Sequence, residues 1–237
     1  MHAHGFGQFC PVAKACEIVA ERWTPLVLRE LMCGSSRFDE LHRGLHNMSR
    51  TLLSARLHQL EDAGVIRSEQ RANGHGREYR LTPVGEELRP IIMALGEWGQ
   101  RWAQSRIDTA DLDVFLLMLD VQRNVPLDRL PPQRTVIRFD FVGMTRTQTE
   151  GRNWWLVLDR AEADLCQRNL GFEVDLVVRA ELRAFAEVWM GHQELATAIR
   201  AKTMTLQGPR ALVRAFPNFL SLSIFARTKS MAATLSS

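Results

Sequence analysis

The first half of the chain spaces its apolar residues three or four positions apart, as amphipathic helices do. Small polar residues stand where such runs begin: Thr24 before Pro25 predicts an N-cap and first-turn proline, Ser36 with Asp39 resembles a capping box, and Ser49 predicts a third cap. Glycines close two of the runs. The pattern predicts four helices, over residues 11–20, 24–33, 36–45 and 50–63.

A helical wheel divides the fourth of these helices into an apolar and a polar side. The apolar side carries Leu52, Leu53, Leu57 and Leu60. Arg56 falls among these leucines, which predicts an internal ion pair or a phosphate contact rather than a base contact. The polar side bears groups that suit the edges of bases, although simple solvation is the alternative. Its members are Arg50, Thr51, Ser54, Ala55 and His58.

A basic hairpin is predicted directly after this helix. Residues 65–71 and 77–81 have strand composition and are separated by the turn-forming run Ala-Asn-Gly-His-Gly. Arg71, His75 and Arg77 make the tip basic. Such a tip beside a groove-sized helix would contact flanking phosphates or the minor groove.

A long helix is predicted from Thr82 and Pro83 to about Ser105. An apolar stripe follows one side of it, and such a stripe beyond a compact module is more often an interface than free surface. We therefore expect it to hold two copies of the chain together. The stripe consists of Ile91, Ile92, Leu95, Trp98 and Trp102.

The second half changes from helical spacing to short alternating segments. An acidic connector over residues 108–113, a short helix through residue 122 and the run Pro-Leu-Asp-Arg-Leu-Pro-Pro come first. Then follow four strand-like segments, two helices, a strand and a closing helix. The whole chain is therefore expected to be α+β, with a mostly antiparallel sheet in its second half.

Composition bounds the function further. The 237 residues leave room for two domains, 46% hydrophobic and 24% charged residues are typical of folded soluble proteins, and a net charge of +3 excludes a general polyanion binder. No apolar run approaches the length of a membrane helix and no signal pattern begins the chain, so we expect a cytoplasmic protein without a membrane partner. The four cysteines have neither disulfide-scaffold nor zinc spacing, and we expect no metal and no cofactor.

Together these residues resemble the HxlR family of winged helix-turn-helix regulators, relatives of the MarR type. The resemblance rests on Cys-Pro-Val from Cys10, Arg-Trp-Thr from Arg22, Leu-Arg-Glu-Leu from Leu28, Arg-Phe-Asp-Glu-Leu from Arg37, the run from Leu53 to Ile66, and Tyr-Arg-Leu-Thr-Pro-Val-Gly from Tyr79. It implies a dimeric cytoplasmic transcription factor whose fourth helix is the recognition helix and whose residues 73–77 are the wing. The wing here lacks the proline-rich form common in that family.

The resulting DNA-binding set joins the polar side of the fourth helix to the hairpin and to one more arginine. It comprises Arg37, Ser49, Arg50, Thr51, Ser54, Ala55, His58, Arg71, Asn73, His75 and Arg77.

Cys10 matches the position where several HxlR-type proteins carry a thiol that senses oxidants or electrophiles. A thiol at a helix N-terminus has its thiolate stabilised, which is the physical requirement for sensing. Lys14 is the one further activating charge within a turn. The alternative is a small residue packed against the partner subunit.

The second half is similar in element order to the sterol carrier protein 2 fold, whose apolar tunnel binds lipids or other hydrophobic ligands. Aromatic side chains could line such a cavity or fill it as ordinary core. The candidates are Trp154, Trp155, Phe172, Phe185, Trp189 and Phe216.

These expectations combine into two domains, a winged-helix DNA-binding and dimerisation domain over residues 1–107 and a sterol-carrier-like effector domain over residues 108–237. The predicted function is a homodimeric regulator, more specifically a repressor, that binds a near-palindromic operator in double-stranded DNA and responds to a hydrophobic small molecule or to oxidants. The competing interpretation is a lipid carrier whose winged domain serves dimerisation only. No catalytic motif is present, so we expect no enzyme.

Overall fold

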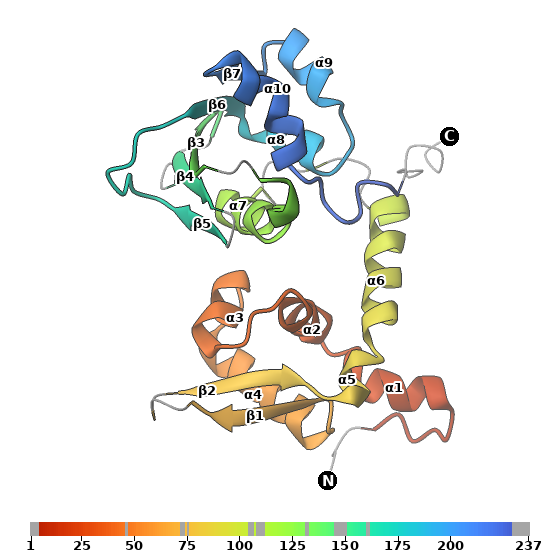
Figure 1. Ribbon diagram of the computed structural model, residues 1–237. Helices are drawn as coiled ribbons and strands as arrows, with labels where there is room; N and C mark the ends of the chain where they lie inside the picture. The colour runs from red at the N-terminus through yellow and green to blue at the C-terminus, as the bar shows by residue number, and fades with distance from the viewer. Residues whose placement is uncertain are drawn as a thin grey trace, which may run out of the picture. The chain divides into compact units, whose positions relative to one another are not determined.

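The computed structural model describes residues 5–45, 47–71, 74, 76–103, 107, 112–130, 133–144, 151–159 and 162–228. The chain divides into two compact units, Met1–Gly96 and Glu97–Ser237, which are described separately. Figure 1 shows helices α1 to α5 with the hairpin in the first unit, and a sheet with helices in the second.

The first unit is helical apart from one hairpin. Its helices and strands are α1 (Pro11–Val19), α2 (Thr24–Met32), α3 (Phe38–Gly44), α4 (Arg50–Asp62), β1 (Ile66–Gln70), β2 (Arg77–Leu81) and α5 (Pro83–Glu86). Helix α6 (Arg89–Trp98) begins in this unit and crosses its boundary at Gly96. Strands β1 and β2 pair antiparallel, from Ile66 opposite Leu81 to Gln70 opposite Arg77. The predicted four helices and hairpin are thus present, in the predicted order.

The core of the first unit is built from α2, α3, α4 and the start of β1. Leu53, Leu57 and Leu60 of α4 are buried, as the wheel predicts, and each contributes about 1.5–3 kcal/mol by leaving water. Leu52 also packs against this core, as the wheel predicts, but its side chain is only partly buried. Residue spacing alone therefore predicted which side of α4 is buried, but not how deeply each side chain of that side is buried.

The N-cap predicted at Ser49 is confirmed, and the structure adds a second at Thr82. Ser49 Oγ accepts a hydrogen bond from the Leu52 amide at 3.2 Å, and Thr82 Oγ1 accepts one from the Gly85 amide at 3.2 Å. The cap predicted at Thr24 is wrong: Thr24 is the first residue of α2, and the preceding Trp23 has a left-handed backbone with φ 79°.

The capping box of the third helix is displaced by one residue. Glu40, not Asp39, accepts hydrogen bonds through its carboxylate, from the amides of Ser36 and Arg37 at 3.0 Å each. The cause is tertiary, because the Ser36 carbonyl accepts a hydrogen bond from the Tyr79 amide at 2.7 Å. The segment before α3 therefore pairs with β2 instead of starting the helix.

The long helix predicted from residue 82 is interrupted. Helix α5 ends at Glu86, α6 begins at Arg89, and a π-helical turn, η1 (Gly99–Ala103), follows it. Pro90 explains the break, since proline has no amide hydrogen and is tolerated only in the first turn of a helix. The predicted end at Ser105 lies outside the described residues.

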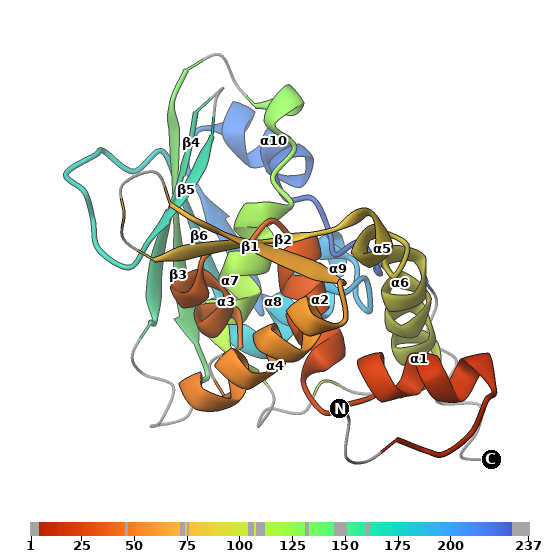
Figure 2. The ribbon, with the colours of Figure 1, turned by 90° about the horizontal axis from the view of Figure 1, so that it is seen from below.

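The second unit is a mixed sheet with helices on one side (Figures 1 and 2). Its elements are α7 (Val114–Arg123), η3 (Leu127–Arg129), β3 (Thr135–Val142), β4 (Asn153–Leu158), β5 (Ala163–Cys166), β6 (Leu176–Glu181), α8 (Leu182–Trp189), α9 (Leu195–Arg200), β7 (Met204–Gln207) and α10 (Arg210–Phe219). The strand order is β5-β4-β3-β6-β7. Among the strand pairs within the described residues, β3–β6 is parallel and the other pairs of this sheet are antiparallel, so the α+β class with a mostly antiparallel sheet is confirmed.

Aromatic side chains fill the core of the second unit. Phe139 lies opposite Trp154 across the β3–β4 pair, and Phe185 packs edge-on against Phe139 with ring centroids 5.6 Å apart. Phe216 joins the same cluster from α10. Among the six aromatic residues predicted as cavity candidates, four are buried core: Trp154, Phe185, Trp189 and Phe216.

The other two candidates lie elsewhere. Trp155 alternates with Trp154 along β4, and it is only partly buried. Phe172 is exposed in a loop, where the Arg134 guanidinium lies 4.9 Å from its ring centroid. The six residues therefore do not surround one cavity, because alternation along a strand sends neighbouring side chains to opposite faces of the sheet.

Candidate nucleic-acid interface

Helix α4 presents a polar side to solvent. Its buried leucines hold the opposite side in the core, and the Ser49 cap fixes its first turn. The five side chains predicted to read bases are all exposed: Arg50, Thr51, Ser54, Ala55 and His58. They combine a guanidinium, two hydroxyls, an imidazole and a methyl group on one helix, which matches the variety of groups in a major groove.

Arg50 is held in place by residues of α3. Its Nη2 lies 2.7 Å from Asp39 Oδ1, and its guanidinium carbon lies 4.9 Å from the centroid of the Phe38 ring. Both charged side chains are exposed, so the ion pair is worth about 0.2–1 kcal/mol. The contact orients the guanidinium without removing it from solvent.

Arg56 points into the body of the unit, and only 12% of its side chain is exposed. Its Nη2 contacts Glu21 Oε2 at 2.7 Å, its Nε donates to the Arg22 carbonyl oxygen at 3.2 Å, and its Nη1 donates to Gln59 Oε1. The helical wheel predicted either an internal ion pair or a phosphate contact for Arg56, and the structure shows the ion pair. Arg56 thus ties α4 to the segment between α1 and α2.

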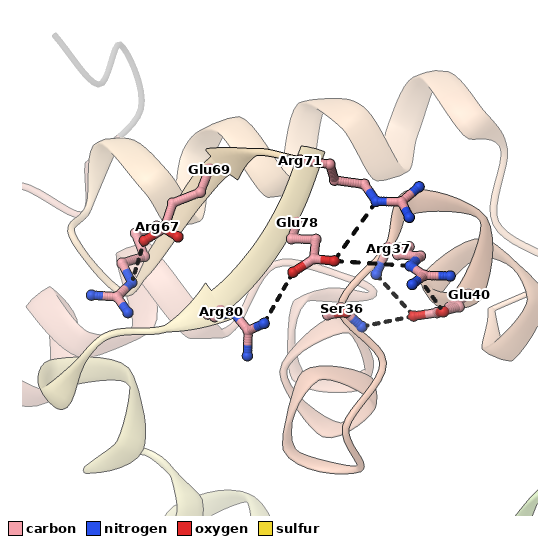
Figure 3. Close-up of polar contacts among 8 residues, drawn as sticks. All are labelled: Ser36, Arg37, Glu40, Arg67, Glu69, Arg71, Glu78 and Arg80. Atoms are coloured by element: carbon pink, nitrogen blue, oxygen red, sulfur yellow. Dashed lines mark hydrogen bonds and ion pairs between the residues drawn. The ribbon is translucent and has the colours of Figure 1, made fainter. Parts of the chain in front are cut away.

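From here on, wing means the whole β1–β2 hairpin with its turn. The carboxylate of Glu78 in this hairpin lies near three arginines (Figure 3). Glu78 of β2 lies 3.0 Å from Arg80 Nη2, 3.7 Å from Arg71 Nε and 4.0 Å from Arg37 Nε. Arg37 and Glu78 also form an isolated antiparallel bridge that joins the start of α3 to the wing. A phosphate approaching this group would compete with Glu78 for the guanidinium groups.

Arg77 of β2 contacts the C-terminal end of α4. Its Nη2 lies 3.5 Å from Glu61 Oε1, and the Ser68 hydroxyl and amide both donate to the same carboxylate oxygen. The Ser68 hydroxyl lowers the pKa of the Glu61 carboxyl, and Arg77 lowers it further against an opposing effect of burial. Glu61 therefore joins α4 to both strands of the hairpin while ionised.

The wing tip is only partly described. Asn73 and His75 lie outside the described residues, whereas Gly74 and Gly76 have φ values of 74° and 81°, which favour glycine in a tight turn. Arg67 and Arg80 are exposed on the hairpin, and sequence reasoning did not select them. The sequence could have indicated both residues, since each is an arginine within a predicted strand of the basic hairpin.

Cys10 occupies the N-cap position of α1 and is partly exposed. The backbone amides of Ala13 and Val12 lower the pKa of its thiol. Lys14, the charge considered as a second activator, is instead 3.0 Å from Glu17 Oε1. The helix N-terminus is therefore the source of the thiolate stabilisation.

Across the described residues, no group of three or more His, Cys, Asp or Glu side chains is arranged to hold a metal ion. Each helix in the described ranges is too short or too polar to cross a membrane.

The short helix α3, the helix α4 with its exposed polar side and the antiparallel hairpin that follows define a winged helix-turn-helix fold. The family model for HxlR-like helix-turn-helix proteins matches residues 18–107. The uncharacterized HTH-type transcriptional regulator YvaP of Bacillus subtilis is 37% identical over 108 residues, which are 45% of this chain and 96% of that protein. The chain belongs to the HxlR-like helix-turn-helix family and is a DNA-binding transcriptional regulator.

Two further similarities lie in the same range. The uncharacterized HTH-type transcriptional regulator Rv3095 of Mycobacterium tuberculosis is 40% identical over 92 residues, covering 38% of this chain and 58% of that protein. The solved structure of the redox regulator HypR in its oxidized form is 28% identical, with a TM-score of 0.38, over 42% of this chain and 99% of that one. The family match ends at residue 107, so it does not extend to the sterol-carrier resemblance.

Proposed function

We propose that the protein is a homodimeric repressor that sets two copies of α4 in successive major grooves of a near-palindromic operator. The observation that carries the proposal is the exposed polar side of α4, whose opposite side is fixed in the core. Half-sites one helical turn apart, about 34–36 Å, would match such a pair. The proposed DNA contacts come from Ser49, Arg50, Thr51, Ser54, Ala55 and His58 of α4, from Arg37, and from Arg71, Asn73, His75 and Arg77 of the wing.

Dimerisation is proposed through the apolar stripe of α6. Ile91, Leu95 and Trp98 recur at helical spacing and are each more than half exposed, at 55%, 53% and 59%. No residue of α6 is buried within the chain. Three large apolar side chains left in water on one helix face favour a partner that covers them.

The proposed regulation uses one of two inputs. Cys10 would respond to oxidants or electrophiles, because its thiolate is stabilised at a helix N-terminus. The second unit would respond to a hydrophobic small molecule, which its element order supports: β6, α8, α9, β7 and α10 follow one another as in the sterol carrier resemblance. In this division residues 1–107 bind DNA and dimerise, and residues 108–237 receive the effector.

An electrophoretic shift with DNA from the region upstream of the protein's own gene tests the proposal. We expect sequence-selective binding at moderate salt, with a shifted species that contains two protein chains. Binding that is equal for unrelated DNA would refute the operator, and would favour a carrier protein whose winged unit only dimerises. Addition of an oxidant or hydrophobic ligand that leaves the shift unchanged would refute the proposed regulation.

A further inference from the structure

One face of the wing is turned away from the core of the first unit. Ser68 of β1 donates its hydroxyl hydrogen to Glu61 of α4, and Tyr79 of β2 packs against the core, so these positions belong to the inner face. Side chains alternate along a strand, and the residues between these positions therefore form the outer face. The outer face carries Arg67, Glu69, Glu78 and Arg80, which Figure 3 shows together.

Glu78 lies in the middle of this outer face. It is opposite Glu69 of β1 on one side, and on the other side it forms the isolated bridge with Arg37. The Tyr79 amide donates to the Ser36 carbonyl at 2.7 Å, so the segment before α3 is attached to β2 directly beside Glu78. Arginines from three separate segments of the chain therefore meet at one carboxylate.

These arginines contact Glu78 without being buried by it. The Nε atoms of Arg37 and Arg71 lie 4.0 and 3.7 Å from Glu78 Oε1, which is longer than a hydrogen bond. Arg80 Nη2 donates to Glu78 Oε2 at 3.0 Å. The side chains of Arg37, Arg71 and Arg80 are 51%, 28% and 57% exposed. An anion from solvent can therefore approach all three guanidinium groups and take the place of the carboxylate.

The cluster continues the polar side of α4. Arg37 directly precedes Phe38, and the ring of Phe38 lies 4.9 Å from the guanidinium carbon of Arg50 at the start of α4. Arg71 follows the last residue of β1, where the turn of the wing begins. Guanidinium groups thus extend from the start of α4 to the turn of the wing, an arrangement that suits successive phosphates of a DNA backbone.

We infer that Glu78 is a positioning residue for DNA binding, whose carboxylate holds in the free protein the place that a backbone phosphate takes in the complex. The guanidinium groups of Arg37, Arg71 and Arg80 exchange the carboxylate for the phosphate. The inference rests on the proposed DNA contacts of Arg37 and Arg71, and it adds Arg80 to them. Glu78 keeps the three groups together before DNA arrives, but its charge repels the incoming phosphate, so it limits affinity for DNA of any sequence.

The salt dependence of DNA binding tests this role, because a residue that only supports the fold would not change it. The logarithm of the association constant falls with the logarithm of salt concentration by about 0.9 for each phosphate neutralised. Glu78→Gln removes the competing charge and keeps the length of the side chain, so the slope should become steeper by about one. Fluorescence anisotropy with a short duplex of arbitrary sequence, between about 50 and 200 mM salt, measures it.

The affinity itself should change in the same titration. The Glu78→Gln protein should bind the duplex about three- to tenfold more tightly than the unmodified protein at the lowest salt, because three exposed ion pairs no longer compete. This advantage should shrink about 3.5-fold between about 50 and 200 mM salt, as the steeper slope requires. An unchanged slope in the Glu78→Gln protein would overturn the inference.

Glu69→Gln is the matched control for the loss of one negative charge. Glu69 lies opposite Glu78 on the same face, and it contacts Arg67 at 3.3 Å. Because Arg67 is not one of the three arginines around Glu78, Glu69→Gln should change the slope by less than about 0.5. Equal changes in the two variants would overturn the inference, since they would show a general effect of net charge.

A second pair of variants applies if the Glu78→Gln protein does not fold. Arg80 and Arg67 lie opposite each other on the outer face and are similarly exposed, at 57% and 61%. Arg80→Gln should make the slope shallower by about one, whereas Arg67→Gln should change it by less than about 0.5. Equal changes in these two proteins would overturn the inference.

The duplex of arbitrary sequence separates this inference from the proposed repressor. A protein that shows the steeper slope with Glu78→Gln but does not select the DNA upstream of its gene would refute the operator and not the role of Glu78. Selection of that DNA together with an unchanged slope would refute the role of Glu78 alone.

Discussion

The guanidinium of Arg50 on α4 is paired with the carboxylate of Asp39 on α3, 2.7 Å away, and lies over the Phe38 ring. Under the proposed DNA contacts, α3 would therefore orient Arg50 before DNA arrives. In the proposed complex Asp39 would have two opposed effects, because it would orient Arg50 and also place a negative charge near the DNA backbone.

Arg50→Ala should weaken specific binding by about 1–3 kcal/mol, the value of a good bidentate base contact. Asp39→Asn should instead tighten binding by up to about fivefold, since an exposed pair of about 0.2–1 kcal/mol no longer has to be broken. Fluorescence anisotropy with operator DNA measures both. Weaker binding of the Asp39→Asn protein would mean that orientation outweighs charge.

Arg56→Ala should lower stability and not sequence selectivity. Two of its contacts tie α4 to Glu21 and Arg22, the third is to Gln59 within α4, and their loss should cost about 1–2 kcal/mol in urea unfolding. Ser54→Ala, at an exposed position of the same helix, is the control and should change the free energy of unfolding by less than about 0.5 kcal/mol. An Arg56→Ala protein of normal stability would contradict the structural role.

Cys10 and Cys166 should differ in alkylation rate. Backbone amides lower the pKa of the Cys10 thiol, whereas burial and then Asp164 raise the pKa of the Cys166 thiol. At neutral pH iodoacetamide should modify Cys10 at least about tenfold faster, because the thiolate is the nucleophile. Peptide mapping by mass spectrometry measures the rates, and prior modification of Cys166 would refute the assignment. Under the proposed sensing, Cys10→Ser should make operator binding insensitive to oxidant.

The contact between Glu61 of α4 and the hairpin should stabilise the protein less as pH falls. The folded pKa of Glu61 is lowered from 4.5, so its stabilisation is complete above about pH 4.5 and is lost as pH falls through the lower folded value. Ser68→Ala should therefore destabilise the protein by about 0.5–1.5 kcal/mol at pH 7 and by less in acid. Urea unfolding over this range measures the difference, and Ser54→Ala, exposed on α4, should show no such pH dependence.

Leu95→Glu should convert the proposed dimer to a monomer. A carboxylate in the middle of the α6 stripe would be buried without a partner on association. Leu127→Glu places the same charge at an exposed leucine of the second unit and should leave the mass unchanged. Sedimentation equilibrium distinguishes the two results, and a Leu95→Glu dimer would exclude this stripe as the interface.

Helical spacing and local caps determined much of the fold from sequence alone. Leu53, Leu57 and Leu60 had to share one side of α4, and Ser49 had to cap it, because both effects act within one or two turns. The exposed polar side of α4 and the antiparallel hairpin follow from the same local rules. The sequence also carried the family motifs in the first unit.

Tertiary structure decided the partners of those side chains. Only packing brought Asp39 to Arg50, paired Ser36 with Tyr79 and so displaced the cap of α3, and put four predicted cavity aromatics into the core. Periodicity fixes the direction of a side chain, whereas its neighbour depends on how distant segments fill space together.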